Sequence, residues 1–285
     1  MPSDRAVALG VVATLVVFGA AIATLDVRAD PAPGTRPGAT APAGVATRSP
    51  RQVLLTAAQS LDDAGSARVR IERQGPAGPA DAVGTLSWGA RVAADLETDD
   101  ALGHGRVLMD DSACYAAHDA PAAGLAAGRW ARADRSRVEA LDPDAVAGGY
   151  AGGWMTTLVS NPAGRLHDVA LTGRLDTVGA EQVDGVATTH YRATVKAAEL
   201  FGADQNLTQA DLAAVLGYYR ERGVESLGYD IWTGADGGLL RMRQSAEGRA
   251  GTDLTTTVVS DPGVAFDVRV PAPDEVTVVA AASAG

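Results

Sequence analysis

Three stretches in the last third of the chain decide the fold: VDGVATTHYRATV (Val183–Val195), SLGYDIWTGADGGLLRMRQS (Ser226–Ser245) and TTTVVSDPGVAFDVRVPAPDEV (Thr255–Val276). In each stretch apolar and polar residues alternate, which is typical of strands with one face in the core. The glycine-rich run Thr233–Gly238 predicts a hairpin loop. We therefore expect strands at Val169–Leu175, Val186–Lys196, Leu227–Trp232, Leu239–Ser245, Thr252–Ser260 and Ala265–Val270.

A helix is predicted between the second and third of these stretches. Thr208 is a good N-cap, and apolar residues recur at helical spacing after it. Gly223 follows the last predicted turn, where glycine commonly ends a helix. The apolar face comprises Leu212, Val215, Leu216 and Tyr219.

The part of the chain before these stretches also begins with a helix signal. Ser49, Pro50 and Gln52 form a capping-box pattern, and Gly65 is placed to end the helix. Short alternating runs bounded by Gly, Asp or Pro follow, and they predict an antiparallel meander. These runs are Ala67–Glu72, Val83–Trp88, Arg91–Glu97, Gly105–Met109, Ala113–Ala117 and Arg129–Arg132.

Together these elements predict an α+β domain, in which a curved antiparallel sheet is crossed by helices. Between the two groups of strands the pattern is weaker. Asp142-Pro143 is a possible start of a short helix, and Trp154–Val159 is a possible second one. The glycines at 148, 149, 152 and 153 weaken both predictions.

The N-terminal region, residues 1–29, predicts export. Ala6–Leu25 carries no charge, and twenty helical residues span about 30 Å, the thickness of a bilayer core. Its length favours an uncleaved membrane helix with the rest of the chain outside the cytoplasm. Val27-Arg28-Ala29 resembles a signal-peptidase site, so a cleaved signal peptide and a secreted protein remain the alternative.

The domain boundaries follow from composition. Residues 30–49 are rich in Pro, Gly, Ala and Thr without apolar periodicity, which predicts a disordered linker. Residues 50–276 hold the predicted β domain, and 277–285 form a tail. Such a linker would hold the domain just off a membrane surface.

Charge and motif content exclude several functions. The formal net charge of −11 argues against a nucleic-acid partner, because phosphate contacts need clustered Lys and Arg. Cys114, the single cysteine, cannot form an internal disulfide. We find no catalytic motif and expect no enzyme activity, cofactor or metal site; a metal at His118-Asp119 beside Asp110 and Asp111 is the weaker alternative. His190 alternates with Tyr191 and is expected to face solvent.

The three stretches resemble the actinobacterial exported lipoproteins related to LolA and to the LppX/LprG group. The shared features are Val186 to Tyr191, the Trp232 to Arg241 hairpin, and Gly263, Phe266, Val268 and Pro271 in the closing stretch. The match is good over Val183–Val276 and loose from Ser49. No cysteine lies near residues 20–30, where this family carries its lipidated cysteine, so the resemblance does not extend to the anchor.

The resemblance implies a half-open β-barrel with helices over its concave face, and a cavity that holds acyl chains. An ordinary core is the preferred explanation for the large apolar residues; the alternative is that some of them line this cavity. The candidates are Trp88, Trp130, Trp154, Leu158, Tyr191, Leu212, Leu216, Tyr219, Tyr229 and Ile231. Arg129 and Arg132, close to Trp130 in sequence, are candidates for contacts with an anionic headgroup.

The sequence therefore predicts extracytoplasmic binding, or transport, of a hydrophobic ligand such as an acyl-chain lipid or a lipoprotein. The alternative is a membrane-tethered interaction or sensor domain that has no ligand cavity and acts through an envelope protein partner.

Overall fold

The computed structural model describes residues 48–76, 78–89, 91–101, 103–121, 125–134, 161–204, 207 and 209–278. The chain divides into two compact units, Met1–Val45 and Ala46–Gly285, and the description below concerns the second. The predicted membrane helix at Ala6–Leu25, the predicted helices near 142 and 154–159, and the tail from 279 lie outside the described residues. No helix within the described residues is long and apolar enough to cross a bilayer.

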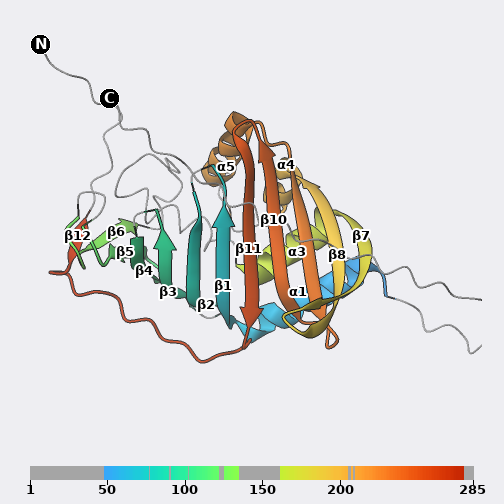
Figure 1. Ribbon diagram of the computed structural model, residues 1–285, viewed down its shortest axis with the longest axis horizontal. Coiled ribbons are helices and arrows are strands. Elements are labelled where there is room, and N and C mark those ends of the chain that lie inside the picture. The colour runs from blue at the N-terminus through green and yellow to red at the C-terminus, as the bar shows by residue number, and fades with distance from the viewer. Residues whose placement is uncertain are drawn as a thin grey trace, which may run out of the picture. The chain divides into compact units, whose positions relative to one another are not determined.

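The described strands form one twelve-stranded sheet (Figure 1). Its order is β12-β6-β5-β4-β3-β2-β1-β11-β10-β9-β8-β7. The bounds are β1 Ser66–Gln74, β2 Ala80–Trp88, β3 Val92–Asp100, β4 Gly103–Met109, β5 Ala113–His118, β6 Trp130–Asp134, β7 Arg174–Val183, β8 Val186–Lys196, β9 Ser226–Gly234, β10 Leu239–Gly248, β11 Gly251–Ser260 and β12 Val276–Val278.

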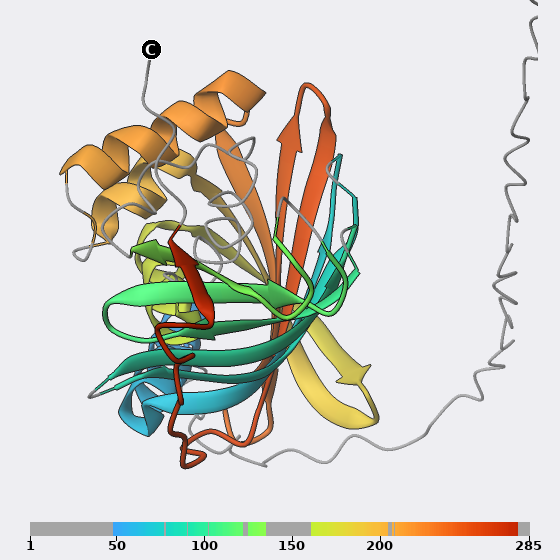
Figure 2. The ribbon, with the colours of Figure 1, turned by 90° about the vertical axis from the view of Figure 1, so that its left-hand side faces the viewer.

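The sheet consists of two meanders joined by the pairing of β1 with β11, where Val69 lies opposite Val259 and Ile71 opposite Thr257. All pairings are antiparallel except that of β12 with β6, which is parallel. The terminal strands β12 and β7 do not pair with each other, so the sheet is not closed. Seen from its β12 end, the sheet is strongly curved (Figure 2). The predicted curved, mostly antiparallel sheet is therefore confirmed.

Four helices accompany the sheet in the described residues: α1 Pro50–Ala64, α3 Pro162–Thr172, α4 Ala197–Ala203 and α5 Gln209–Arg222. The start of α1 agrees with the prediction, because the Ser49 side chain accepts from the Gln52 amide while the Gln52 side chain accepts from the Ser49 amide. Gly65 ends the helix with φ of 68°, a backbone conformation that glycine adopts without a Cβ clash.

Helix α3 corrects one prediction. The apolar run Val169–Leu175 was expected to be a strand, but α3 continues to Thr172 and β7 begins at Arg174. Asn161 caps α3 by accepting from the Gly164 amide, and Pro162 occupies its first turn. The Arg51 guanidinium of α1 donates to the carbonyls of Ala170, Leu171 and Gly173, so it satisfies the exposed end of α3.

The last described segment corrects another prediction. Ala265–Val270 was expected to be a strand, but residues 264–272 form no strand pairing. Instead Val268 and Val270 pack against Leu108 and Tyr115. Alternation along β4 and β5 places those two residues on the convex face, so this segment makes a small second core there.

Candidate functional site

The concave face of the sheet is the candidate site. Inward-pointing residues of both meanders join the inner sides of α1, α3 and α4 in one apolar cluster. The helices make their main sheet contacts with β1, β7, β8 and β10, so they cover mostly the β7–β11 half. The larger inward side chains of that half are Tyr191, Val195, Leu227, Tyr229, Ile231 and Met242.

Seven of the predicted lining residues join this cluster, six of them from β8, β9 and α5. Tyr191, Tyr229 and Ile231 are buried on the inner faces of β8 and β9. Leu212, Leu216 and Tyr219 of α5 pack against the same cluster while staying partly exposed. Trp88 also joins it, and its indole Nε1 donates to the Leu61 carbonyl of α1 at 3.3 Å.

The other predicted site residues lie elsewhere. Trp154 and Leu158 are outside the described residues. Trp130 packs with Val268 and Val270 in the convex-side core, so it is not placed with these seven. Arg129 donates to the Asp274 carbonyl at 2.6 Å, and Arg132 lies opposite Tyr115 in the sheet register. Both arginines therefore belong to the convex-side surroundings of β6.

A polar network crosses the helix–sheet layer and was missed from the sequence. The Tyr229 hydroxyl donates to Gln244 Oε1 at 2.7 Å and accepts a hydrogen bond from Arg165 of α3. The Arg165 guanidinium also lies 4.8 Å from the Phe201 ring centroid. Burial raises the pKa of both Tyr219 and Tyr229, so these phenols stay neutral. Because α3 itself was not predicted, no sequence signal placed Arg165 here.

The inner face of the β2–β6 half alternates small residues with larger ones such as Leu86, Leu96 and Met109. Ala82, Ala94 and Ala116 point inward, with Gly84 and Gly105 in the same rows. A Cβ on Gly84 would collide with the Asp95 carbonyl of β3, and one on Gly105 would collide with the Ala117 carbonyl of β5. Both glycines are thus required where neighbouring backbones come unusually close on the concave side.

The concave wall is closely packed in this structure. Ala94, Leu96, Val107 and Cys114 have no exposed surface. Burial raises the pKa of the Cys114 thiol to about 12, so it is a neutral core group. A hollow of about 460 Å³ lies instead along the outer side of α1, lined by Leu55, Thr56, Gln59, Ser60 and Asp63. This mixed lining does not suit an acyl chain.

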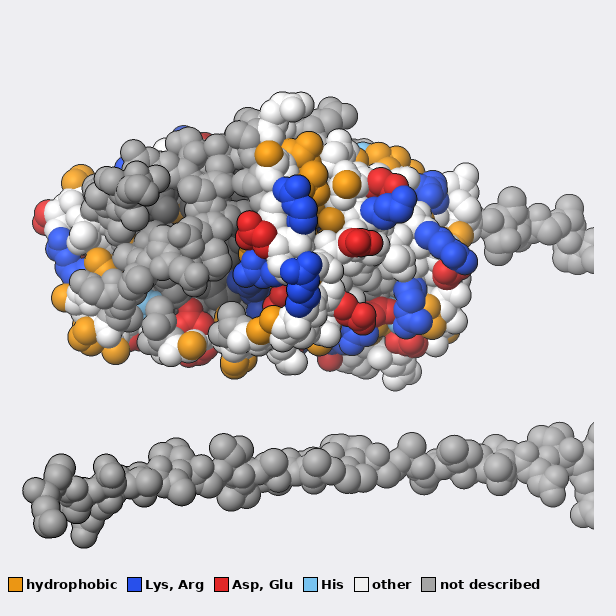
Figure 3. Space-filling model, turned by 90° about the horizontal axis from the view of Figure 1, so that it is seen from above, with side chains coloured by type: hydrophobic (Ala, Val, Ile, Leu, Met, Phe, Trp, Pro, Cys, Tyr) orange, Lys and Arg blue, Asp and Glu red, His pale blue; other side chains and the backbone are white. Residues whose placement is uncertain are grey.

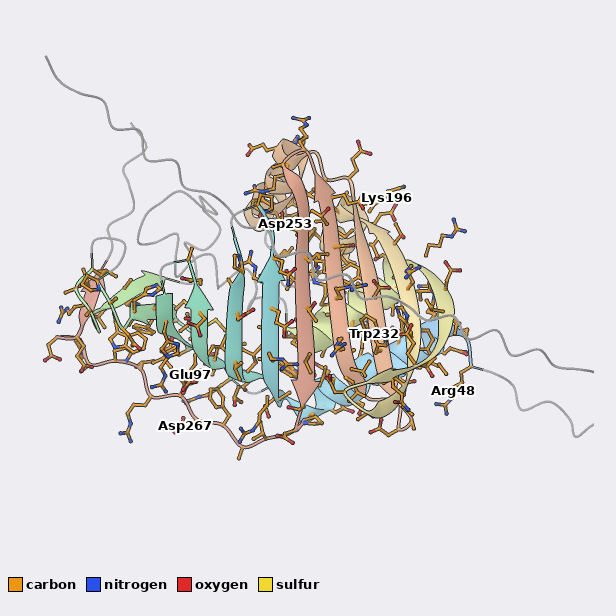
Figure 4. The ribbon with its side chains drawn as sticks, in the orientation of Figure 1. Arg48, Glu97, Lys196, Trp232, Asp253 and Asp267 are labelled. Carbon is orange, nitrogen blue, oxygen red and sulfur yellow. The ribbon has the colours of Figure 1, made fainter. Side chains whose placement is uncertain are left out.

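The convex face carries a second polar arrangement, around His190 of β8. The prediction that His190 faces solvent is wrong, because the residue is 4% exposed. Its Nδ1 lies 2.8 Å from Glu181 Oε1, and its Nε2 lies 2.8 Å from Asp230 Oδ1. The ring stacks on Trp232, labelled in Figure 4, at 4.5 Å between centroids. Trp232 Nε1 completes the group by donating to Glu181 Oε2 at 2.8 Å.

Both carboxyl groups around His190 are stabilised as anions. Hydrogen bonds from Trp232 and then His190 hold the pKa of Glu181 below its usual range. Burial alone would raise the pKa of Asp230, but donors from Arg243, His190 and Arg192 outweigh it and lower that pKa. The polar atoms of this group hydrogen-bond to one another, and these contacts leave no space between them for a substrate.

The remaining titratable groups in the described part of the chain do not assemble into a metal site. His104 lies near Asp99 and Asp119 at distances of 3.5 and 3.9 Å, and all three side chains are well exposed. Seen from above, acidic and basic side chains are intermixed on the described surface (Figure 3).

Comparisons with known proteins give a partial sequence match and several structural ones. No family model matches it. It is 30% identical over 156 residues to an uncharacterized 31.2 kDa protein from the rplA–rplJ intergenic region of Streptomyces griseus. The match covers 54% of this chain and 49% of that protein, so it spans about half the length of this curated relative.

Three solved structures are similar to this one at low sequence identity. LprF from Mycobacterium bovis is 14% identical at a TM-score of 0.45, covering 78% of this chain and 96% of LprF. Mycobacterium tuberculosis lipoprotein LppX is 13% identical at a TM-score of 0.45, covering 76% of this chain and 99% of LppX. A chain of the Pseudomonas aeruginosa MucA/MucB complex is 15% identical at a TM-score of 0.34, and the match covers 79% of this chain and 59% of that one. LprF and LppX belong to the LppX/LprG group that the motifs at 183–276 resemble.

Proposed function

We propose that this protein binds a hydrophobic ligand, of the class of acyl-chain lipids, between the concave face of the sheet and the helices. The ligand would lie against Tyr191, Tyr229 and Ile231 and would extend toward the small residues of β2–β5. The interaction is non-covalent, and it gains about 0.8 kcal/mol for each methylene removed from water.

The observation that carries this proposal is the state of α5. Leu212, Val215, Leu216 and Tyr219 face the main apolar cluster, yet all four remain partly exposed. The principal packing partner of α5 is the short helix α4. A helix held this lightly can move away at small cost, which would open the closely packed interior to a ligand. In this proposal α5 is the cover of the site.

The proposed location is outside the cytoplasm. The uncharged stretch Ala6–Leu25 would either anchor the chain in the cytoplasmic membrane or be cleaved during export, and residues 30–49 would serve as a spacer. The ligand would then be taken from, or delivered to, the outer side of that membrane.

Native mass spectrometry of protein purified from its own membranes tests the proposal. We expect a fraction of molecules to carry a mass increment that organic extraction removes and that lipid analysis identifies. Protein that is reproducibly free of bound lipid, together with no binding of added fatty acid or phospholipid, would contradict it.

A second candidate is an interaction or sensor domain without a cavity. The absence of exposed surface at Ala94, Leu96, Val107 and Cys114 favours it, because these residues already have complete packing partners. For this candidate, cross-linking in intact membranes should recover a specific envelope protein, and the purified domain should hold no lipid.

A further inference from the structure

The convex-side group around His190 joins three strands, one of which is a free edge of the sheet. Among the described strands β7 pairs with β8 alone, and most of its residues are exposed. Its residue Glu181 uses both carboxylate oxygens, one toward His190 of β8 and one toward Trp232 of β9. The edge strand is thereby tied to its second neighbour as well as to its first.

A β-bulge aims Glu181 at this position. Asp176 lies opposite Arg192, and the register then shifts so that Gly179 lies opposite His190 and Glu181 opposite Thr188. If Val178 took its place in a regular alternation, Glu181 would share the concave face with Thr177; because Val178 is instead an extra, unpaired residue, Glu181 faces the convex side. Gly179 lies in this bulge with φ of 147°, a backbone conformation that favours glycine. The bulge therefore serves the contact between Glu181 and His190.

The contacts depend on protonation at three groups. An ionised carboxylate can accept but not donate, and both ring nitrogens of His190 face carboxylate oxygens at 2.8 Å. Both contacts are hydrogen bonds when the ring is the imidazolium form and both acids are ionised. The other charged groups nearby are Arg192 of β8, Arg241 and Arg243 of β10, and Asp184 in the β7–β8 turn. The arginines pair with Asp230 and Asp184, so the side-chain contacts of this group that reach β7 itself are those of Glu181 with His190 and with Trp232.

We propose that Glu181, His190 and Asp230 form a protonation-controlled latch that fixes edge strand β7 and thereby limits access to the helix–sheet interior. The role of the latch in limiting access rests on the proposed ligand binding, whereas its role in fixing β7 does not. α1 packs against β7, so release of this strand would loosen the helix cover on that side. The latch is closed while the acids are ionised and the imidazole is protonated. A neutral imidazole has one N–H for two carboxylates, so only one of the two contacts can then remain a hydrogen bond and the latch is weaker.

Hydrogen exchange and NMR on the full chain test the latch without any ligand. We expect the ring nitrogens of His190 to report its titration, and β7 amides to lose protection about tenfold, after correction for intrinsic exchange, over the same pH interval. Glu181→Gln should lose about the same protection at neutral pH and should abolish the pH dependence. Glu72→Gln is the matched control, because its side chain is also 43% exposed and ion-paired on the same face, but on β1.

The results separate this inference from ligand binding. Protection of β7 that does not change as His190 titrates, or that is equal in Glu181→Gln and Glu72→Gln, overturns the latch. If β7 responds as expected, the release rate of a fluorescent fatty acid from preloaded protein should rise in Glu181→Gln and not in Glu72→Gln. An unchanged release rate overturns the access role. Failure of the wild type to take up the probe would count against the proposed function and leave the exchange result standing.

Discussion

The two halves of the sheet solve the same curvature problem with different side chains. On the concave side of β7–β11 the residues are large, among them Tyr191, Tyr229 and Ile231, and helices cover them. On β2–β5 small inward residues such as Ala82 and Ala94 lie between larger ones such as Leu96, and neighbouring backbones come too close at Gly84 and Gly105 to admit a Cβ. The large side chains of β7–β11 thus fill the space beneath the helices, whereas the glycines of β2–β5 allow the sheet to bend tightly.

The largest expected effect is on stability, and it compares a glycine-to-alanine substitution in one half of the sheet with the same substitution in the other half. In Gly84→Ala the new Cβ would also lie 2.9 Å from the Leu96 Cα, so backbone must move. We expect the free energy of unfolding to fall by about 3 kcal/mol or more, measured by urea denaturation. In Gly228→Ala of β9 the nearest atom is the Ser245 hydroxyl oxygen, which can rotate away. A loss of about 1 kcal/mol or less is expected there. Equal losses would show that curvature is not concentrated in the first half.

A smaller effect should follow from removing the tie between α1 and α3. Arg51→Met keeps an apolar stem but leaves the carbonyls at the end of α3 without this donor. We expect a loss of about 1–2 kcal/mol in thermal or urea unfolding, because charge-assisted hydrogen bonds are removed. Arg174→Met, at an exposed position on β7, serves as the control and should change stability little. If both variants unfold alike, the helix cover does not depend on Arg51.

The β7–β10 region should make the stability of the protein depend on pH, because it contains Glu181 and Asp230. The pKa values of Glu181 and Asp230 are lowered in the folded state, so their stabilising contribution is present above about pH 4, the unfolded value. It is lost as pH falls through the folded pKa values. The urea midpoint of the wild type should therefore decline below about pH 4, and it should decline less in Glu181→Gln. Parallel pH profiles for the two proteins would contradict this assignment.

The strands and first helix were predictable because their signals are local. The capping box at Ser49 and Gln52, and the alternation of 186–196, 227–232, 239–245 and 252–260, correspond to α1, β8, β9, β10 and β11. The position of Asn161-Pro162, a cap followed by a first-turn proline, could have revealed α3, but the β-branched and apolar run at 169–175 outweighed it. β7 escaped prediction because its bulge breaks the alternation.

The site was only partly predictable, because it depends on pairings distant in sequence. Seven predicted apolar residues do meet, six of them from β8, β9 and α5, since alternation and helical spacing place them on inward faces. Burial of His190 arises from Glu181 and Trp232, which are 9 and 42 positions away. The separation of Trp130 depends on the segment carrying Val268 and Val270, which crosses to the convex side. Whether these seven residues line a ligand site stays a prediction.

The most direct test of ligand binding compares two adjacent residues of β2 that face opposite sides. Ala82 is buried on the concave wall, and Val83 is 54% exposed on the convex face. Lipid occupancy by native mass spectrometry and the melting temperature would be measured for Ala82→Leu and Val83→Leu. The account predicts that Ala82→Leu loses most bound lipid while remaining folded, and that Val83→Leu matches the wild type. Equal lipid occupancy in both variants, or none in the wild type, would contradict it.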